Sequence, residues 1–153
     1  MAFAVILISA TDVLPLRHAV LRPGRPAASA IFDGDTDLNT VHLGAHVGNV
    51  LVGVATLLPR PTPGNGAAGA WQLQEGAWQL RGMAVEPTYQ RHGVGTALVY
   101  ACVGEVAKRD GKLIWCNARL AAVPFYERLG FEVHGDEFDI PDVGPHFRMF
   151  RPL

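Results

Sequence analysis

One stretch of the chain restricts the fold more than any other: an apolar strand, a loop with glycines, and a long helix. Trp78–Val85 has the composition of a strand and ends at Glu86 and Pro87, because proline cannot continue a central ladder. Gly93 and Gly95 then stand at the start of an apolar helix. Glycines there let backbone N–H groups approach an anion closely, and the helix dipole favours negative charge. The segment therefore predicts a ligand that carries phosphate.

Taken alone, the two glycines are equally compatible with a purely structural tight turn. The segment lacks the Gly-Lys-Ser/Thr of a P-loop and the third glycine of a Rossmann fingerprint, so neither nucleotide-binding class is supported. The helix is predicted over Gly93–Asp110, with Lys108 and Arg109 in its last turn and Gly111 beyond it. Its apolar positions share one side: Val94, Ala97, Leu98, Ala101 and Val106.

The rest of the chain alternates between strand and helix patterns. The expected strands are Phe3–Ser9, Val41–Ala45, Asn49–Leu57, Trp78–Val85, Leu113–Asn117, Phe131–Val133 and His146–Phe150. A first helix is expected after a cap at Thr11 or Asp12, and a short one over Pro124–Leu129. A tight turn at His46–Asn49 joins two of the strands into a hairpin. This order predicts an α/β fold with a mixed sheet flanked by helices.

Size and composition favour a single domain. The 153 residues, 49% of them hydrophobic, fall within the usual size of one domain and suffice for one sizeable core. Pro59–Gly69 is rich in proline and glycine and reads as an exposed loop within the domain. We therefore expect one domain over residues 1–153.

Charge and hydropathy argue against two classes of partner. A formal net charge of -1 and a pI near 6.6 give no excess of Lys and Arg for a nucleic acid or an anionic membrane, so neither is expected. The apolar run Phe3–Ile8 is too short to span a bilayer and has no basic leader. It is interpreted as a buried strand.

No metal site is expected. Cys102 and Cys116 lack Cys-x-x-Cys spacing, and the six histidines form no regular ligand pattern with them, so a reduced, cytoplasmic, metal-free protein fits best. Asp33–Asp37 superficially suggests a calcium loop. However, Leu38 stands where the required glycine belongs and Gly44 where the bidentate Glu belongs, so a solvated turn is expected instead.

Three segments resemble the GNAT superfamily of N-acetyltransferases. Gln90-x-x-Gly93-x-Gly95 matches the family's pyrophosphate loop, Q/R-x-x-G-x-G/A, between a strand and a long helix. Ala122–Phe131 resembles its A-x-x-F-Y-x-x-x-G-F segment, and Gly144–Met149 looks like the tail of a subset of small bacterial members. The resemblance implies a GNAT-like acyl-CoA N-acyltransferase fold, with a central mixed sheet splayed after the fourth strand. It also implies transfer of an acetyl group from acetyl-coenzyme A to an amine, without a metal.

The resemblance implies which residues meet coenzyme A. Backbone amides of Gln90–Thr96 would hold the pyrophosphate; for the side chains of Arg91 and His92, solvent exposure is the alternative. The backbones of Met83 and Val85 would bond the pantetheine arm as an added strand. The full set implied to bind the cofactor is Met83, Ala84, Val85, Gln90, Arg91, His92, Gly93, Val94, Gly95, Thr96 and Asn117.

Asn117 and Tyr126 lie in the downstream part of the resemblance. The amide of Asn117 could bond the pantetheine arm, with a turn at the strand end as the alternative role. Aminolysis of a thioester releases a thiolate whose thiol has a pKa of about 8.5, and a tyrosine hydroxyl with a pKa of about 10 stays protonated at neutral pH. Tyr126 therefore suits a general acid, the alternative being an aromatic core residue.

The general base is harder to assign. An alkyl amine with a pKa of about 10.4 must first lose a proton, which costs about 4 to 5 kcal/mol at pH 7. Many family members place a glutamate where Gln79 stands, and Gln79 cannot titrate. The remaining candidates are His42, His46, Glu75 and His146, of which we rank His146 first.

The resemblance implies that Leu16–Gly24 lies where the family builds the acceptor side of its cleft, so Arg17 and Arg22 could meet an anionic group on the substrate. Exposure on a helix face is the alternative for both. The expected activity is acetylation of the primary amine of a small molecule by direct attack in a ternary complex. Alternatives are a protein or peptide N-acetyltransferase and a non-catalytic module that binds coenzyme A. A homodimer is compatible with the sequence.

Overall fold

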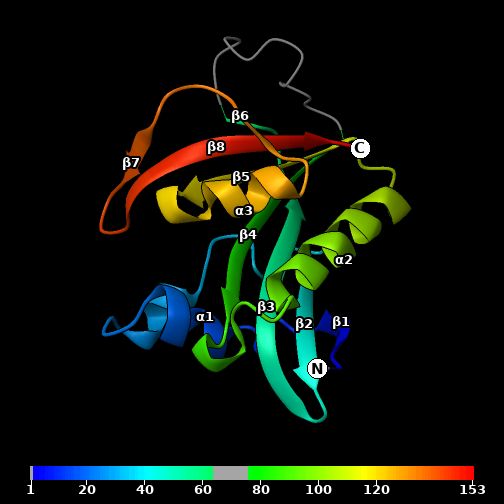
Figure 1. The fold of residues 1–153 in the computed structure, drawn as a ribbon, viewed down its shortest axis with the longest axis vertical. Coiled ribbons are helices and arrows are strands. Elements are labelled where there is room, and N and C mark those ends of the chain that lie inside the picture. The colour runs from blue at the N-terminus through cyan, green and yellow to red at the C-terminus, as the bar shows by residue number, and fades with distance from the viewer. Residues whose placement is uncertain (1, 64–75) are drawn as a thin grey trace. The chain divides into compact units, whose positions relative to one another are not determined.

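The structure, a computed structural model, describes residues 2–63 and 76–153. The chain forms two compact units: unit 1 contains Met1–Leu58 and Leu80–Gly104, and unit 2 contains Pro59–Gln79 and Glu105–Leu153. The helices and strands of both are labelled in Figure 1. The single domain expected over residues 1–153 stays a prediction, and the loop expected at Pro59–Gly69 lies in part outside the described residues.

The strands of unit 1 follow the order β1-β2-β3-β4. β1 (Ala4–Ile8) pairs antiparallel with β2 (Val41–Val47), and β2 pairs antiparallel with β3 (Val50–Pro59). The predicted hairpin is confirmed. Its turn contains Gly48 with a φ of 59°, the left-handed conformation that tight hairpin turns use. The predicted strand after it is β4 (Ala77–Val85), whose last six residues belong to unit 1.

β1 is an edge strand, so the expectation of a buried strand at Phe3–Ile8 is wrong. Ile6 is 52% exposed and Leu7 is 54% exposed. Among the described residues, β1 is the first strand in the order and pairs with β2 alone. An apolar run indicates a strand but not its place in the sheet, because both edge and central strands can be apolar. Ile8 is partly buried and packs on the core of this unit.

α1 (Leu14–Leu21) begins after Val13, which makes no side-chain cap. The cap predicted at Thr11 or Asp12 is wrong because Asp12 forms a turn with Ser9. Ser9 N donates to the Asp12 carboxylate at 3.3 Å, and Asp12 N donates to Ser9 Oγ at 3.1 Å. The core of unit 1 contains Val13, Val54 and Ala84, with Leu14, Leu16, Val20 and Leu21 packed against it.

The predicted long helix is confirmed as α2 (Val94–Lys108). A short 3₁₀ helix, η3 (Pro87–Tyr89), lies in the loop between β4 and α2. The buried residues of α2 lie three or four positions apart, except for one adjacent pair, so they share one face. They are Val94, Leu98, Val99, Cys102 and Val106. Cys102 and Cys116 are buried free cysteines, and burial raises the pKa of the Cys116 thiol.

The strands of unit 2 follow the order β4-β5-β8-β6, with β7 paired to β8. They are β5 (Leu113–Arg119), β6 (Glu132–Val133), β7 (Phe138–Ile140) and β8 (Gly144–Pro152). β5 pairs antiparallel with β8, whereas Ala77–Gln79 of β4 pair in parallel with Leu113–Trp115. The expected mixed sheet is therefore confirmed (Figure 1). The three-residue strand β7 is an element that the sequence did not predict.

The predicted short helix is α3 (Val123–Arg128), which follows the 3₁₀ helix η4 (Leu120–Ala122). Its start one residue before Pro124 suits proline, which is tolerated in the first helical turn. Gly130 follows with a φ of 91°. The core cluster of unit 2 contains Ala77, Leu113, Trp115 and Phe150.

Candidate active site

Hydrogen bonds join the loop between β4 and α2 to β3 and β4 and also form within it. Glu86 N donates to the carbonyl of Val52 at 2.8 Å. The Glu86 carboxylate accepts from the N–H of Thr88 at 3.0 Å and so caps η3. Gln90 Nε2 donates to the carbonyl of Val85 at 3.0 Å. The first residue of the predicted motif thus joins the loop to the end of β4.

Two residues of this loop have left-handed backbone: Arg91 with a φ of 64° and Gly93 with a φ of 86°. Among the described residues, a Cβ at Gly93 would come near only Phe3 Cζ, at 3.9 Å. Conformation, not lack of space, therefore requires glycine at 93. The left-handed conformation costs a residue with a Cβ of order 1–3 kcal/mol, and such residues gather at ligand clamps. Alternating left- and right-handed backbone turns successive N–H groups into an anion-binding concavity.

α2 begins directly after this turn. The first N–H groups of a helix have no partner within it, which applies to Val94–Thr96. Ala97 N is the first to donate within this turn, to the carbonyl of Gly93 at 3.0 Å. Residues 91–93 are exposed. Unit 1 thus brings the predicted motif residues together at the positive end of the helix dipole, where an anion is stabilised.

The side chains at the end of β4 differ in burial. Ala84 is 2% exposed and belongs to the core cluster with Val13 and Val54. Side chains alternate along a strand, so Met83 and Val85, both half-buried, lie on the opposite face. Their backbone contact with a pantetheine arm stays a prediction.

Tyr126 lies in α3 of unit 2 and is 7% exposed. Its ring meets Phe125 with a centroid distance of 5.1 Å and Phe131 at 5.2 Å, both edge to face. Such pairs add to the stabilisation that burial provides and fix the ring plane. A phenyl ring at the same position would keep both contacts.

His146 lies in β8 of unit 2, opposite Arg119 of β5 and Phe138 of β7, and is 4% exposed. Its Nδ1 is 2.7 Å from the carbonyl oxygen of Gly144. Because a carbonyl only accepts, Nδ1 carries the proton, and in the neutral ring Nε2 then carries the lone pair. His146 therefore has the tautomer in which Nε2 can accept a proton.

The other base candidates fit less well. The ring nitrogens of His42 lie 2.8 Å from Thr56 Oγ1 and 2.8 Å from the carbonyl oxygen of Asp35. Both nitrogens are therefore engaged within the protein. His46 Nδ1 is buried without a partner among the described residues, as is Gln79 Oε1. Glu75 lies outside the described residues.

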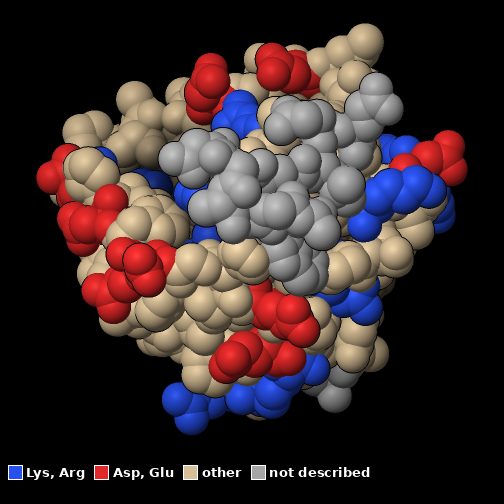
Figure 2. Space-filling model, turned by 90° about the horizontal axis from the view of Figure 1, so that it is seen from above, with Lys and Arg blue, Asp and Glu red and all other residues tan. Residues whose placement is uncertain are grey.

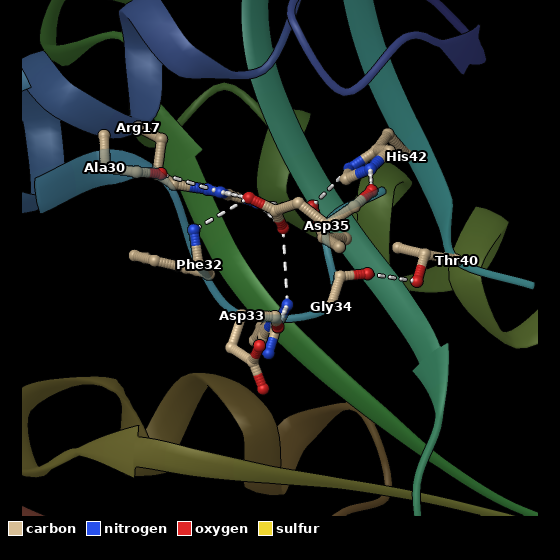
Figure 3. A network of polar contacts seen from close by, with 10 residues as sticks. Arg17, Ala30, Phe32, Asp33, Gly34, Asp35, Thr40 and His42 are labelled. Atoms are coloured by element: carbon tan, nitrogen blue, oxygen red, sulfur yellow. Dashed lines mark hydrogen bonds and ion pairs between the residues drawn. The ribbon is translucent and has the colours of Figure 1, made fainter. Parts of the chain in front are cut away.

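Arg17, predicted to bind substrate, is instead fully buried. Its guanidinium donates to the carbonyl of Ala30 at 2.8 Å, to Asp35 at 2.6 and 3.2 Å, and to Thr56 Oγ1 at 2.8 Å (Figure 3). Position 17 of α1 thus faces the segment around residue 35 and not the solvent. Arg17 has its partners inside unit 1, so we do not carry it into the proposed substrate site.

His42 completes a closed ring of contacts around Asp35. Its Nε2 is 2.8 Å from the Asp35 carbonyl and its Nδ1 is 2.8 Å from Thr56 Oγ1, which in turn accepts from Arg17 (Figure 3). Asp35 is only 6% exposed, so the solvated turn expected at Asp33–Asp37 is wrong at this residue. The sequence did not reveal this role of Asp35, because the residues of the ring are distant along the chain. Arg17 is 18 residues from Asp35 and 39 residues from Thr56.

Asp35 is ionised at neutral pH. Burial alone would raise its pKa, but hydrogen bonds from Arg17 and Phe32 N and the charges of Arg17 and Arg81 outweigh burial and lower the pKa below 3.8. Arg81 also approaches the Asp35 carboxylate, at 3.3 Å. The carboxylate therefore neutralises charge in the interior of unit 1.

Arg22 lies beside the same segment. Its Nη1 donates to the carbonyl of Leu21 at 3.0 Å, and its guanidinium lies 5.2 Å from the centre of the Phe32 ring. The guanidinium groups of Arg17 and Arg81 lie over this ring at 4.0 and 5.6 Å. Contact between half-buried Arg22 and an anionic group of the substrate stays a prediction.

Within residues 2–63 and 76–153, no group of three or more His, Cys, Asp or Glu side chains could hold a metal ion. In the same ranges, no helix is both long and apolar enough to cross a membrane. Among the described residues on the face in Figure 2, acidic and basic side chains are interspersed.

Comparison with known sequences finds likeness over nearly the whole chain. The family described as acetyltransferase (GNAT) family matches residues 15–131. An uncharacterized N-acetyltransferase of Bacillus subtilis, YitI, is 30% identical over 146 residues, 95% of this chain and 93% of that protein. The ribosomal protein bS18-alanine N-acetyltransferase of Escherichia coli is 42% identical over 55 residues, 34% of this chain and 37% of that protein.

Comparison with solved structures finds the same architecture. An aminoglycoside 6′-N-acetyltransferase complexed with coenzyme A matches with a TM-score of 0.74 and 17% identity. The match covers 97% of this chain and 96% of that one. At this identity the likeness shows the fold, and it confirms the fold class expected from the sequence.

Proposed function

The chain belongs to the acetyltransferase (GNAT) family, and from that premise we propose that it transfers the acetyl group of acetyl-coenzyme A to the primary amine of a small molecule. Family membership makes it an acyltransferase. The observation that carries the proposal is the loop before α2, where residues 91–93 are exposed and Arg91 and Gly93 have left-handed backbone. This arrangement suits a pyrophosphate, because N–H groups and the helix dipole both favour a concentrated negative charge.

The proposal gives each part of the candidate site one task. Coenzyme A, when bound, supplies the acetyl group as a thioester. Gln90–Thr96 bind the pyrophosphate, chiefly through backbone amides. The backbones of Met83 and Val85 and the side chain of Asn117 bind the pantetheine arm. Each task is a hydrogen bond that the named groups can donate or accept.

Two side chains move the protons of the reaction. The protonated acceptor first releases one proton to give the neutral amine. Transfer then forms a C–N bond and breaks a C–S bond, while a further proton leaves the nitrogen for water and one reaches the departing sulfur. His146 Nε2 takes the first proton, because the Gly144 carbonyl keeps the other nitrogen protonated. The Tyr126 hydroxyl donates the proton that reaches the sulfur, since a tyrosine hydroxyl with a pKa of about 10 is protonated at neutral pH. Attack is direct, with both substrates bound together.

A protein N-terminus is the second candidate acceptor. The observation that favours it is the 42% identity over 55 residues to an enzyme that acetylates an alanine of a ribosomal protein. That match spans only 34% of this chain, which is too little to carry over the acceptor. A non-catalytic module that binds coenzyme A is the third reading, favoured by Gln79 in place of a glutamate. Asn117 and Tyr126 together argue against it.

Thermal shift by coenzyme A tests the loop. We expect a 100-fold excess over the dissociation constant to stabilise the protein by about 2.7 kcal/mol, or about 5 to 11 °C in Tm. Gly93→Val places a β-branched residue at positive φ and should remove most of this shift. Gly48→Val is the matched control, because Gly48 also has positive φ and a Cβ there meets nothing within 4 Å. A full shift in folded Gly93→Val would overturn the loop assignment.

An acceptor panel separates the three candidate functions. Acetyl-coenzyme A is incubated with aminoglycosides, polyamines or a peptide that begins with alanine, and release of free thiol is measured. Turnover with a small amine supports the proposal, and turnover confined to the peptide supports the second candidate. Binding of coenzyme A without turnover on any member of the panel supports the non-catalytic module.

A further inference from the structure

Asn117 of β5 and Arg148 of β8 stand directly opposite each other in the antiparallel register. Opposite residues of a pair project from the same face of a sheet, so their side chains can interact. Arg148 Nε donates to Asn117 Oδ1 at 3.2 Å. The pair joins a residue proposed to bind coenzyme A to one that has no such assignment.

This contact determines the orientation of the Asn117 carboxamide, that is, which of its two ends is the oxygen and which is the NH₂ group. An arginine side chain has N–H donors and no acceptor, so the atom that faces it must be the oxygen of the amide. The Nδ2 group is then the end that Asn117 can offer to a ligand, and it can only donate. A ligand group that meets it must be an acceptor, such as an amide carbonyl oxygen.

Arg148 is itself held in place by aromatic rings. Its guanidinium lies 4.9 Å from the centre of the Phe138 ring and 5.8 Å from that of Trp115. Trp115 is two residues before Asn117 on β5 and therefore shares its face of the sheet. Nη1 also reaches the carbonyl of Pro63, at 3.5 Å. Burial lowers the pKa of Arg148, which agrees with a position partly withdrawn from water.

We propose that Arg148 is a positioning residue that holds the carboxamide of Asn117 so that its Nδ2 donates to a carbonyl oxygen of the pantetheine arm. The inference rests on the proposed function, because it assumes that Asn117 meets coenzyme A. Without Arg148 the amide can turn over and present its oxygen, which a carbonyl repels.

Asn117→Asp separates the donor from the pair. An aspartate keeps and strengthens the contact with Arg148, since the hydrogen bond becomes charge-assisted, but it has no N–H to donate. We expect the Tm to stay unchanged or to rise. The dissociation constant for coenzyme A, measured by calorimetry, should rise about threefold to tenfold. A folded Asn117→Asp that binds as tightly as the parent would overturn the assigned polarity.

Arg148→Met tests positioning through Asn117. We expect coenzyme A to bind about twofold to fivefold more weakly, as for part of one hydrogen bond, with the KM for acetyl-coenzyme A raised and kcat nearly unchanged. In an Asn117→Ala background the same substitution should add no further loss, because its effect passes through the amide. Equal losses in both backgrounds would contradict the proposal.

Arg151→Met is the matched control. Arg151 is a second arginine of β8, and its Nε donates to the carbonyl of Leu129 at 3.0 Å, away from Asn117. This variant should keep the parent's affinity for coenzyme A even if its Tm falls. Should the parent itself fail to bind coenzyme A, both the proposed function and this inference fall. Binding by the parent with no change in Asn117→Asp and Arg148→Met overturns the inference alone.

Discussion

Asp35→Asn removes the negative charge beside Arg17 while keeping nearly the same side-chain shape. Asp35 is 6% exposed and Arg17 is fully buried, so water cannot take the place of the lost charge. The Asp35 carboxylate accepts from Arg17 at 2.6 Å and from Phe32 N at 2.9 Å. Whichever way it turns, the NH₂ group of an asparagine would face donors: Arg17 Nη1 and Phe32 N at one oxygen position, or Nη2 of Arg17 and of Arg81 at the other. The substitution therefore leaves a buried cation and at least one donor poorly satisfied.

The magnitude follows from the burial of both partners. Breaking a buried ion pair by removing one partner costs about 3–5 kcal/mol, because the remaining charge is uncompensated. We expect Asp35→Asn to lower the free energy of unfolding by this amount. Asp37 lies in the same turn but is exposed, so Asp37→Asn should change it by less than about 0.5 kcal/mol. Comparing the two variants separates the loss of the buried ion pair with Arg17 from a general effect of removing a negative charge from this turn.

The pKa of Asp35 adds a dependence on pH. Its pKa in the folded protein is lowered from the ordinary value of 3.8. A carboxyl with a lowered folded pKa contributes stability that is fully present above the unfolded pKa and is lost as pH falls through the folded pKa. The difference between parent and Asp35→Asn should therefore hold from pH 7 down to about pH 4 and shrink at lower pH. At low pH the parent's Asp35 is protonated and as neutral as asparagine.

Urea unfolding followed by far-ultraviolet circular dichroism measures both effects, with the m-value as the check that the same surface unfolds. The reasoning is refuted if Asp35→Asn costs less than about 1 kcal/mol at an unchanged m-value, since a buried pair should cost several times more. It is also refuted if Asp37→Asn costs as much. A difference that does not shrink in acid would mean that the carboxylate charge is not its source.

Two further predictions concern the chemical step. Tyr126→Phe keeps the ring contacts with Phe125 and Phe131 and should lower kcat by about 10²-fold or more with little change in KM for acetyl-coenzyme A. Steady-state kinetics on a folded variant checks this, and a kcat within about threefold of the parent would make Tyr126 a wall of the site. His146→Gln should lower kcat/KM by about 10²-fold or more for an amine with a pKa near 10, but much less for one with a pKa near 7. Equal losses with both amines would argue against His146 as the base.

The loop before α2 could be predicted because its signals are local. Gln90 bonds to Val85 only five residues away, and Gly93 needs its positive φ for the turn in which it stands. The apolar period of the helix that follows is equally visible along the chain. Sequence patterns carry such short-range requirements directly, so the turn and the helix after it could be predicted from the residues, and the family resemblance assigned them to coenzyme A.

Arg148 and Asp35 could not be found in this way because their partners are distant in the chain. Arg148 bonds Asn117 across a separation of 31 residues. Phe138, one of the two aromatic residues near its guanidinium, belongs to a strand of three residues, which is too short to show an alternation of apolar and polar residues. Asp35 looked like part of a polar turn because nothing near it in sequence shows that Arg17 is buried. In both cases the sheet register and the packing decide the partner, and spacing does not encode either.

Gly82 shows how such a hidden partner shapes the site. It has a φ of 62° within β4, and a Cβ there would lie 2.8 Å from Arg17 Nε. In the sequence it is one residue of an apolar strand, whereas in unit 1 it is the position at which the strand passes the buried guanidinium. Met83 follows directly, so the backbone that we propose to bind the pantetheine arm comes one residue after the close approach to the Arg17 guanidinium. A side chain at position 82 would collide with this guanidinium, which explains the glycine there.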